Sequence, residues 1–288
     1  MFNFLKFQKL YLTISALVIG FGLYSIVQWG FHYSIDFVGG SNLEYRSNKP
    51  LKKNLVESIV KAEKVIISNI SINNSNILIQ TQPIDEKQEL KIRTNIEKQA
   101  KVKIEQLRFE TVGPTLGKET MNKTIIASIL AVMGILLYMS FAFKGVNFAI
   151  AAIVAMCHDF LVVVGSYSLL SHYFGAQLDT LFVTAVLTTM SFSVHDTIVI
   201  FDKIREYINN EGRGNITYFA NRALTETMVR SLNNSMTIVF MLLSLILLGG
   251  SMIRFFIVTL LIGTITGTYS SPFIATPILV WLEKRKKR

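Results

Sequence analysis

The stretch Leu181–Phe201 reads LFVTAVLTTMSFSVHDTIVIF and is long and apolar enough for a membrane-spanning helix. It nevertheless contains a carboxylate, Asp196. A charged side chain in such a helix costs roughly 3 kcal/mol or more on insertion scales, so it usually faces a bundle interior or a wet cavity. Ser193 and Thr189 lie on the same helical face, and His195 begins a second polar stripe beside it. This pattern indicates a path for water, protons or ions, with Asp196 as its centre.

The composition of the whole chain agrees with a membrane protein that carries one soluble insert. Of its 288 residues, 51% are hydrophobic, and the mean hydropathy is +0.43. The net charge of +10 lies largely in loops and in the tail 284–288. Membrane proteins use such clusters to set orientation and to contact anionic lipid. We therefore expect membrane lipid, and no nucleic acid, as a partner.

Six apolar segments approach or exceed the length that a membrane-spanning helix needs. They are 10–29, 121–141, 148–170, 181–201, 234–248 and 255–281. The first follows two lysines and lacks a cleavage motif, so we interpret it as an uncleaved helix. The last contains Pro272 and Pro277, which predict a kink, a tilt or an early helix end. The fold class is therefore an α-helical polytopic membrane protein.

The lysines and arginines of the short loops predict the orientation. The N-terminal residues 1–9, the loop 202–230 and the basic tail are rich in them, whereas 171–180 has none. Both termini are therefore expected in the cytoplasm. The long segment after the first helix is then expected outside it.

That segment, 31–120, has the pattern of a small α+β domain. We expect strand material at 35–38 and 43–46 around Gly39-Gly40, helices at 52–62 and 85–101, and strands at 65–72, 77–81 and 104–112. The order βαββαβ is typical of a ferredoxin-like module. The chain is thus divided into 1–30, the domain 31–120, a helical bundle 121–283 and the tail 284–288.

Two His-Asp pairs lie in neighbouring apolar segments, His158-Asp159 and His195-Asp196. Imidazole and carboxylate bind zinc, but no HExxH is present and adjacent residues on a helix point about 100° apart, so we expect no metal. For His158-Asp159 we consider a hydrogen-bonded pair that couples helices, or a role in proton movement.

Arg230 begins the fifth apolar segment and is the natural partner for Asp196, with Asn234 one turn later. Its charge would favour the ionised carboxylate, while desolvation would favour the protonated one. These opposed influences are suited to a switch, so Asp196, Arg230, His195 and Asn234 form our candidate proton relay. The simpler alternative makes Arg230 an interface anchor.

Glycine motifs flank the small domain, Gly39-Gly40 shortly after Asp36 and Gly113-Pro114 at the far end. We interpret both as hinges between strands and membrane helices. The spacing Gly263–Gly267 predicts close helix packing. We find no nucleophile–base triad, phosphate loop or dinucleotide fingerprint, so we expect neither enzymatic activity nor a cofactor.

Four motifs together resemble the SecF family, subunits of the bacterial SecD–SecF protein-export complex. They are SIDFVGG at 34–40, ETVGPTLG at 110–117, His158-Asp159, and SVHDTIVIFDKIRE at 193–206. The resemblance covers nearly the whole chain. It implies a resistance-nodulation-division fold, pairing with a SecD-like subunit beside the Sec translocon channel, and residence in the bacterial inner membrane. It also implies use of the proton gradient to move unfolded, exported polypeptide.

By the same resemblance, Asp196 matches the family's membrane aspartate and Arg230 its arginine. Two positions depart from the family pattern: His195 stands where asparagine is usual, and Asn234 where a hydroxyl is usual. Since histidine titrates near neutral pH, His195 is expected to modulate proton uptake.

Two rival functions make different predictions. A structural subunit that stabilises the translocon predicts that Asp196→Asn is silent. A small-molecule transporter of the same superfamily predicts a larger extracytoplasmic portion with a ligand cavity.

Overall fold

The computed structural model describes residues 3–143, 145–212, 214–250 and 253–286. It divides into two compact units. The helical unit comprises Met1–Phe31, Ala127–Ala176 and Thr180–Arg288, and the small domain comprises His32–Ile126 with Gln177–Asp179.

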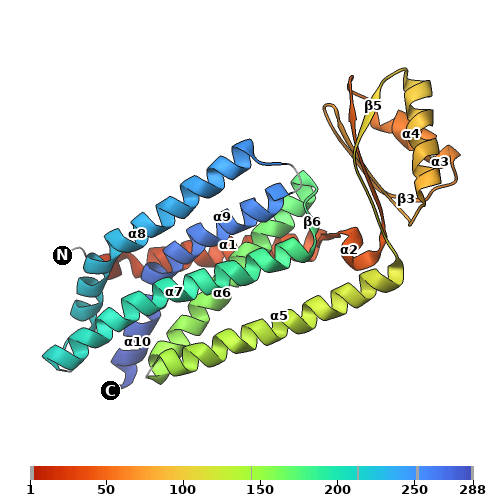
Figure 1. Cartoon of the computed structure of the whole chain (residues 1–288). Coiled ribbons are helices and arrows are strands. Elements are labelled where there is room, and N and C mark those ends of the chain that lie inside the picture. Colours follow the sequence, from red (N-terminus) through yellow and green to blue (C-terminus); the bar gives the residue numbers. More distant parts are fainter. Residues whose placement is uncertain (1–2, 144, 213, 251–252, 287–288) are drawn as a thin grey trace. The chain divides into compact units, whose positions relative to one another are not determined.

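Among the described residues, six helices are long and apolar enough to cross a membrane, which confirms the six predicted segments. They are formed by η1 (Phe4–Phe7) with α1 (Gln8–Trp29), α5 (Pro114–Ala142), α6 (Val146–Phe174), α7 (Thr180–Glu211), α8 (Ile216–Leu248), and α9 (Arg254–Ser270) with η3 (Ser271–Ala275) and α10 (Thr276–Lys286). One end of the helical unit holds the start of α1, the end of α10 and the connection between α7 and α8 (Figure 1).

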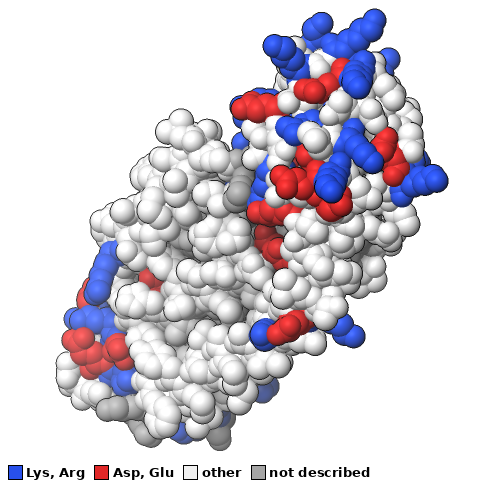
Figure 2. Space-filling view, turned by 45° about the vertical axis from the view of Figure 1, so that its right-hand side comes forward, with Lys and Arg blue, Asp and Glu red and all other residues white. Residues whose placement is uncertain are grey.

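The middle of the helical unit is formed by α6, α7 and α9. About half of the apolar stretch of each of these spans is buried within the chain, whereas α1, α5 and α8 leave most of theirs exposed. In Figure 2 the visible flank of this unit is nearly free of charged side chains, which gather at one end. The outer helices therefore present apolar surface suited to lipid or to another membrane protein.

Glycines bring the central helices close together. A Cβ on Gly263 of α9 would lie 2.2 Å from the Thr189 methyl of α7, and one on Gly267 would lie 3.0 Å from the Ser193 Cβ. This confirms the close packing predicted from the Gly263–Gly267 spacing. Gly22 of α1 and Gly165 of α6 approach each other in the same way.

The segment 202–230, expected as a cytoplasmic loop with a turn at 211–214 between two helical stretches, is mostly helical. α7 continues to Glu211, and α8 begins at Ile216 with the Asn215 side chain accepting from the Thr217 N–H at 3.0 Å. Ion pairs one turn apart support the extension, such as Lys203–Glu206 at 3.0 Å. Hydropathy detects only the apolar part of such a helix, so the apolar segments 181–201 and 234–248 are shorter than the helices that contain them.

Pro272 interrupts the last span. α9 ends at Ser270, and η3 is a π-helical turn before α10 begins at Thr276. Proline has no N–H to donate to the preceding turn, so the ladder widens there. The early helix end predicted from the prolines is confirmed. Ser270 at the end of α9 and Ser271 at the start of η3 contact Asp159 of α6 and Thr197 of α7.

The small domain has the predicted ferredoxin-like fold. Its main sheet contains β2 (Gly40–Ser47), β3 (Ile67–Asn73), β4 (Asn76–Thr81) and β5 (Ile104–Val112), all antiparallel in the order β3-β4-β2-β5. The helices α3 (Lys53–Ala62) and α4 (Glu86–Ala100) cover one face (Figure 1). Between sheet and helices lies a continuous aliphatic core.

The start of the domain differs from the prediction. Residues 35–38 form a short helix, α2 (Ile35–Val38), rather than a strand, because the Ser34 side chain caps it by accepting from the Asp36 N–H at 3.2 Å. In addition, β1 (His32–Tyr33) pairs in parallel with β6 (Gln177–Leu178). Strands of two residues leave no periodicity in a sequence, so the pairing was not predicted.

A buried hydrogen bond joins the sheet and α4 across the core of the small domain. The Tyr45 hydroxyl of β2 donates to Glu89 of α4 at 2.8 Å, and Arg93 lies 3.4 Å from the same carboxylate. Burial, followed by the Glu89 charge, raises the pKa of Tyr45 well above its ordinary value. The hydroxyl therefore stays protonated and ties α4 to the sheet.

Replacing Tyr45 by phenylalanine is expected to lower the stability of this domain by about 1–3 kcal/mol, because the buried Glu89 carboxylate loses its donor. Hydrogen exchange of the β2 and α4 amides in the full chain measures this loss. The matched control is Tyr33→Phe, where an exposed tyrosine loses the same hydroxyl. Equal exchange in both variants would contradict the prediction.

Candidate functional site

Asp196 faces the interior of the helical unit. It lies on α7 with 5% of its surface exposed, and the Ser231 hydroxyl of α8 donates to its Oδ2 atom at 2.7 Å. The stripe of α7 formed by Thr189, Ser193 and Asp196 is therefore buried within the helical unit, as the cost of a carboxylate in hydrocarbon requires.

A cavity of about 250 Å³ lies beside this carboxylate. It is lined by His195, Asp196, Val199, Ile200, Thr227, Arg230, Ser231 and Asn234. The structure thus brings together all four residues of the candidate relay, two from α7 and two from α8. A polar cavity of this size has room for water.

The charged side chains that line the cavity do not contact each other directly. Among the described residues, no salt bridge joins Arg230 to Asp196, although the two line the same cavity. Arg230, His195 and Asn234 are each exposed at the surface of the chain. The Asp196 carboxylate is therefore bound directly by the neutral Ser231 hydroxyl. His195 and Arg230 line the cavity from positions exposed at the surface.

Ser231 was not found from the sequence. It follows Arg230 directly, and α8 repeats a hydroxyl every fourth residue at Thr227, Ser231 and Ser235. That spacing marks the face of α8 that packs against α7 and α9. The prediction rested instead on the face of Arg230 and Asn234. The next polar residue on that face, Thr237, donates to the Asn233 carbonyl of its own helix.

The His158-Asp159 pair lies in a second buried cluster. Asp159 of α6 accepts from the His158 Nδ1 atom at 2.8 Å, from the Ser270 hydroxyl at 2.6 Å and from Ser193 of α7. One carboxylate thus connects three helices. The His158 Nε2 atom is buried and has no hydrogen-bond partner within the described chain.

Hydroxyl groups link this cluster to the Asp196 region. Thr197, beside Asp196 on α7, contacts Ser271 of η3 at 2.9 Å and donates to the Ser193 carbonyl at 3.1 Å. The Thr268 hydroxyl of α9 donates to Ser235 of α8 at 2.6 Å. The sequence indicated none of these partners, because an isolated serine or threonine in an apolar helix usually bonds its own backbone.

The residues do not favour a metal site. Within residues 3–143, 145–212, 214–250 and 253–286, no three histidine, cysteine or acidic side chains gather closely enough to hold an ion. The Asp159 carboxylate is occupied by hydroxyl donors.

The two glycine motifs of the small domain contact each other. A Cβ on Gly39 would lie 2.7 Å from the Pro114 Cα, and one on Gly117 would lie 2.8 Å from the Gly39 nitrogen. Gly39 also has φ +75°, a conformation that disfavours other residues. Asp36 is half-buried in α2, and the space around Gly113 is open. The motifs form a close backbone junction, and their role as hinges stays a prediction.

Comparison with known protein families gives two matches. Residues 91–285 match the family described as Protein export membrane protein SecD/SecF, C-terminal, and residues 24–51 match the SecD/SecF GG Motif. The second match contains the Gly39-Gly40 pair.

Similar proteins cover the chain from end to end. The Protein translocase subunit SecF of Thermobaculum terrenum is 37% identical over 99% of this chain and 95% of its own length, and that of Anaerolinea thermophila is 35% identical over 100% and 96%. The crystal structure of SecDF, a translocon-associated membrane protein from Thermus thermophilus, matches 99% of this chain with a TM-score of 0.84 at 28% identity. The crystal structure of SecDF in its super-membrane-facing form matches 99% of this chain with a TM-score of 0.69.

This chain spans 39% of the SecDF chain but nearly all of its SecF relatives. The six apolar helices and the inserted α+β domain agree with the family matches, and the sequence identity extends over the full chain. The chain therefore belongs to the SecF family of Sec protein-translocase subunits.

Proposed function

We propose that this chain couples the proton gradient to polypeptide export, with Asp196 as the residue that binds and releases the proton. The observation that carries the proposal is a membrane-buried carboxylate that contacts a polar cavity and is bound by a neutral serine. A structural carboxylate would be fully paired, as Asp159 is. Asp196 instead keeps access to space that water can occupy.

The other cavity residues have supporting roles in this proposal. Arg230 favours the charged carboxylate when the two approach, and Asn234 offers an amide to water in the cavity. His195 supplies an imidazole that lines the same cavity. Moving one charge across the membrane yields about 2.3 kcal/mol per 100 mV, which is enough to bias a two-state arrangement of helices.

We further propose a SecD-like subunit as the partner, the Sec translocon channel as the neighbour and unfolded exported polypeptide as the substrate. The SecDF resemblance and the exposed apolar flank of α8 support the partner. The basic connections on one side of the membrane support an inner-membrane location with both termini in the cytoplasm. The small domain is then periplasmic and moves against substrate.

Asp196→Asn is expected to abolish the gradient-dependent part of export, because an amide of the same shape cannot take up and release a proton. We would measure export of a signal-bearing reporter in cells depleted of the native subunit and rescued with each variant. The proton gradient is varied with an uncoupler.

Asp202→Asn is the matched control, since it makes the same change at an exposed carboxylate on the same helix. Equal accumulation of every variant in the membrane is required. Rescue by wild type and Asp202→Asn alone supports the proposal. Rescue by Asp196→Asn with unchanged gradient dependence would refute the proton role and favour a purely structural subunit.

A further inference from the structure

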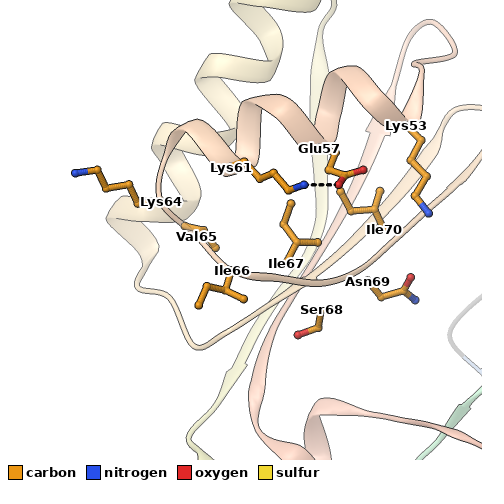
Figure 3. A pocket seen from close by; sticks show the side chains of 10 residues that line it. All are labelled: Lys53, Glu57, Lys61, Lys64, Val65, Ile66, Ile67, Ser68, Asn69 and Ile70. Atoms are coloured by element: carbon orange, nitrogen blue, oxygen red, sulfur yellow. Dashed lines mark hydrogen bonds and ion pairs between the residues drawn. The ribbon is translucent and has the colours of Figure 1, made fainter.

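A groove of about 570 Å³ runs along the small domain between α3 and β3, remote in sequence from the Asp196 cavity. Figure 3 shows the helix on one side and the strand on the other, with Lys53 and Lys64 at opposite ends. The lining residues are Lys53, Glu57, Lys61, Lys64, Val65, Ile66, Ile67, Ser68, Asn69 and Ile70.

The floor of the groove is an edge strand. β3 pairs with β4 alone, so one side of its backbone carries N–H and C=O groups without a strand partner among the described residues. Its pairing with β4 also shifts register between Ile67 and Asn69. An open edge can pair with an extended peptide, and natural sheets hinder such pairing with short strands, bulges or lysines. A strand added here must therefore neutralise the nearby lysines.

The wall of the groove is positively charged. It carries three lysines and one carboxylate, Glu57, which already binds Lys61 at 2.7 Å. The hydrogen bond and the charge of Lys61 hold the pKa of Glu57 below its usual range, so this carboxylate stays ionised and paired. Lys53 and Lys64 remain to bind anionic groups at the two ends.

We infer that this groove binds an extended, carboxylate-bearing stretch of the exported polypeptide as an added strand on β3. The backbone of β3 supplies hydrogen bonds that do not depend on sequence, and the lysines favour acidic side chains on the incoming strand. Exposed Ile66 at one end adds apolar contact. The inference rests on the proposed function only for the source of the peptide.

The test uses the full chain in detergent and a fluorescent, unstructured peptide of alternating threonine and glutamate. Anisotropy reports its binding. A second peptide carries lysine in place of glutamate, and a third has alternate backbone amides N-methylated, which prevents strand pairing without changing charge. The binding-site variant is Lys53→Gln/Lys61→Gln/Lys64→Gln, and the matched control is Lys87→Gln/Lys91→Gln/Lys98→Gln on α4.

We expect the acidic peptide to bind wild type and the α4 variant alike. The groove variant and the N-methylated peptide should each lose about tenfold in affinity, the equivalent of roughly 1.4 kcal/mol, and the lysine peptide should not bind. Three results overturn the inference: absence of binding, equal losses in the two lysine variants, or full binding of the N-methylated peptide. This binding assay contains no proton gradient, and the Asp196→Asn chain is expected to bind the acidic peptide as wild type does. A negative result in this assay would therefore not contradict the proposed proton role of Asp196.

Discussion

Replacing Asp159 by alanine is expected to remove a large part of the stability of the helical unit. The carboxylate is 3% exposed and binds His158, Ser193 and Ser270, so the change leaves three buried donors without their acceptor. Individual hydrogen bonds between membrane helices contribute about 0.6–1.7 kcal/mol, and two of the three bonds, those to Ser193 and Ser270, join different helices, so the loss is about 1–3 kcal/mol. The melting temperature of the solubilised chain and its accumulation in the membrane measure it.

Two further variants give this prediction its controls. Asp159→Asn keeps an oxygen that accepts from the serines, so a smaller decrease in melting temperature is expected. Asp202→Ala removes an exposed carboxylate from the end of α7 and is expected to change little. A wild-type melting temperature for Asp159→Ala would show that the pair does not hold the helices together. The alternative left open by the sequence, a role in proton movement, would then be the better account.

Replacing Gly263 by alanine is expected to force α7 and α9 apart. The new Cβ would lie 2.2 Å from the Thr189 methyl and 2.4 Å from its Cβ, so backbone must move. Overpacking costs about 1–3 kcal/mol by itself. The shift would also stretch the Ser193–Asp159 and Thr197–Ser271 contacts one and two turns away. A lower melting temperature and reduced export activity should follow together.

The chain offers a matched control and a rescue for this variant. Gly134→Ala places the same methyl group in open space on α5, where nothing lies within 4 Å, and is expected to leave the melting temperature unchanged or raised. Thr189→Gly removes the atoms that the new Cβ would meet, so it should partly restore the Gly263→Ala chain. If Thr189→Gly lowers stability further with no restoration, the clash is not the cause.

Much of the candidate site was predictable because lipid imposes a strong constraint. A polar residue inside an apolar helix must face the protein interior or water, so Asp196 could be assigned to one site with Arg230, the cation at the start of a nearby span, and with Asn234 one turn later. The hydroxyl partners could not be predicted in this way. Ser231, Ser270 and their neighbours are small and common in membrane helices, and their role depends on which face of the next helix meets them.

The six apolar helices, the βαββαβ order of the small domain and the carboxylate at the centre of the site can all be predicted from the sequence. Each of these follows from local periodicity or from the cost of burying a charge. The pairing of His32–Tyr33 with Gln177–Leu178, and the contacts of Ser270 with Asp159 and of Ser271 with Thr197, are seen only in the folded structure. These features depend on contacts between residues far apart in the chain, whose energies are absent from any local window of sequence.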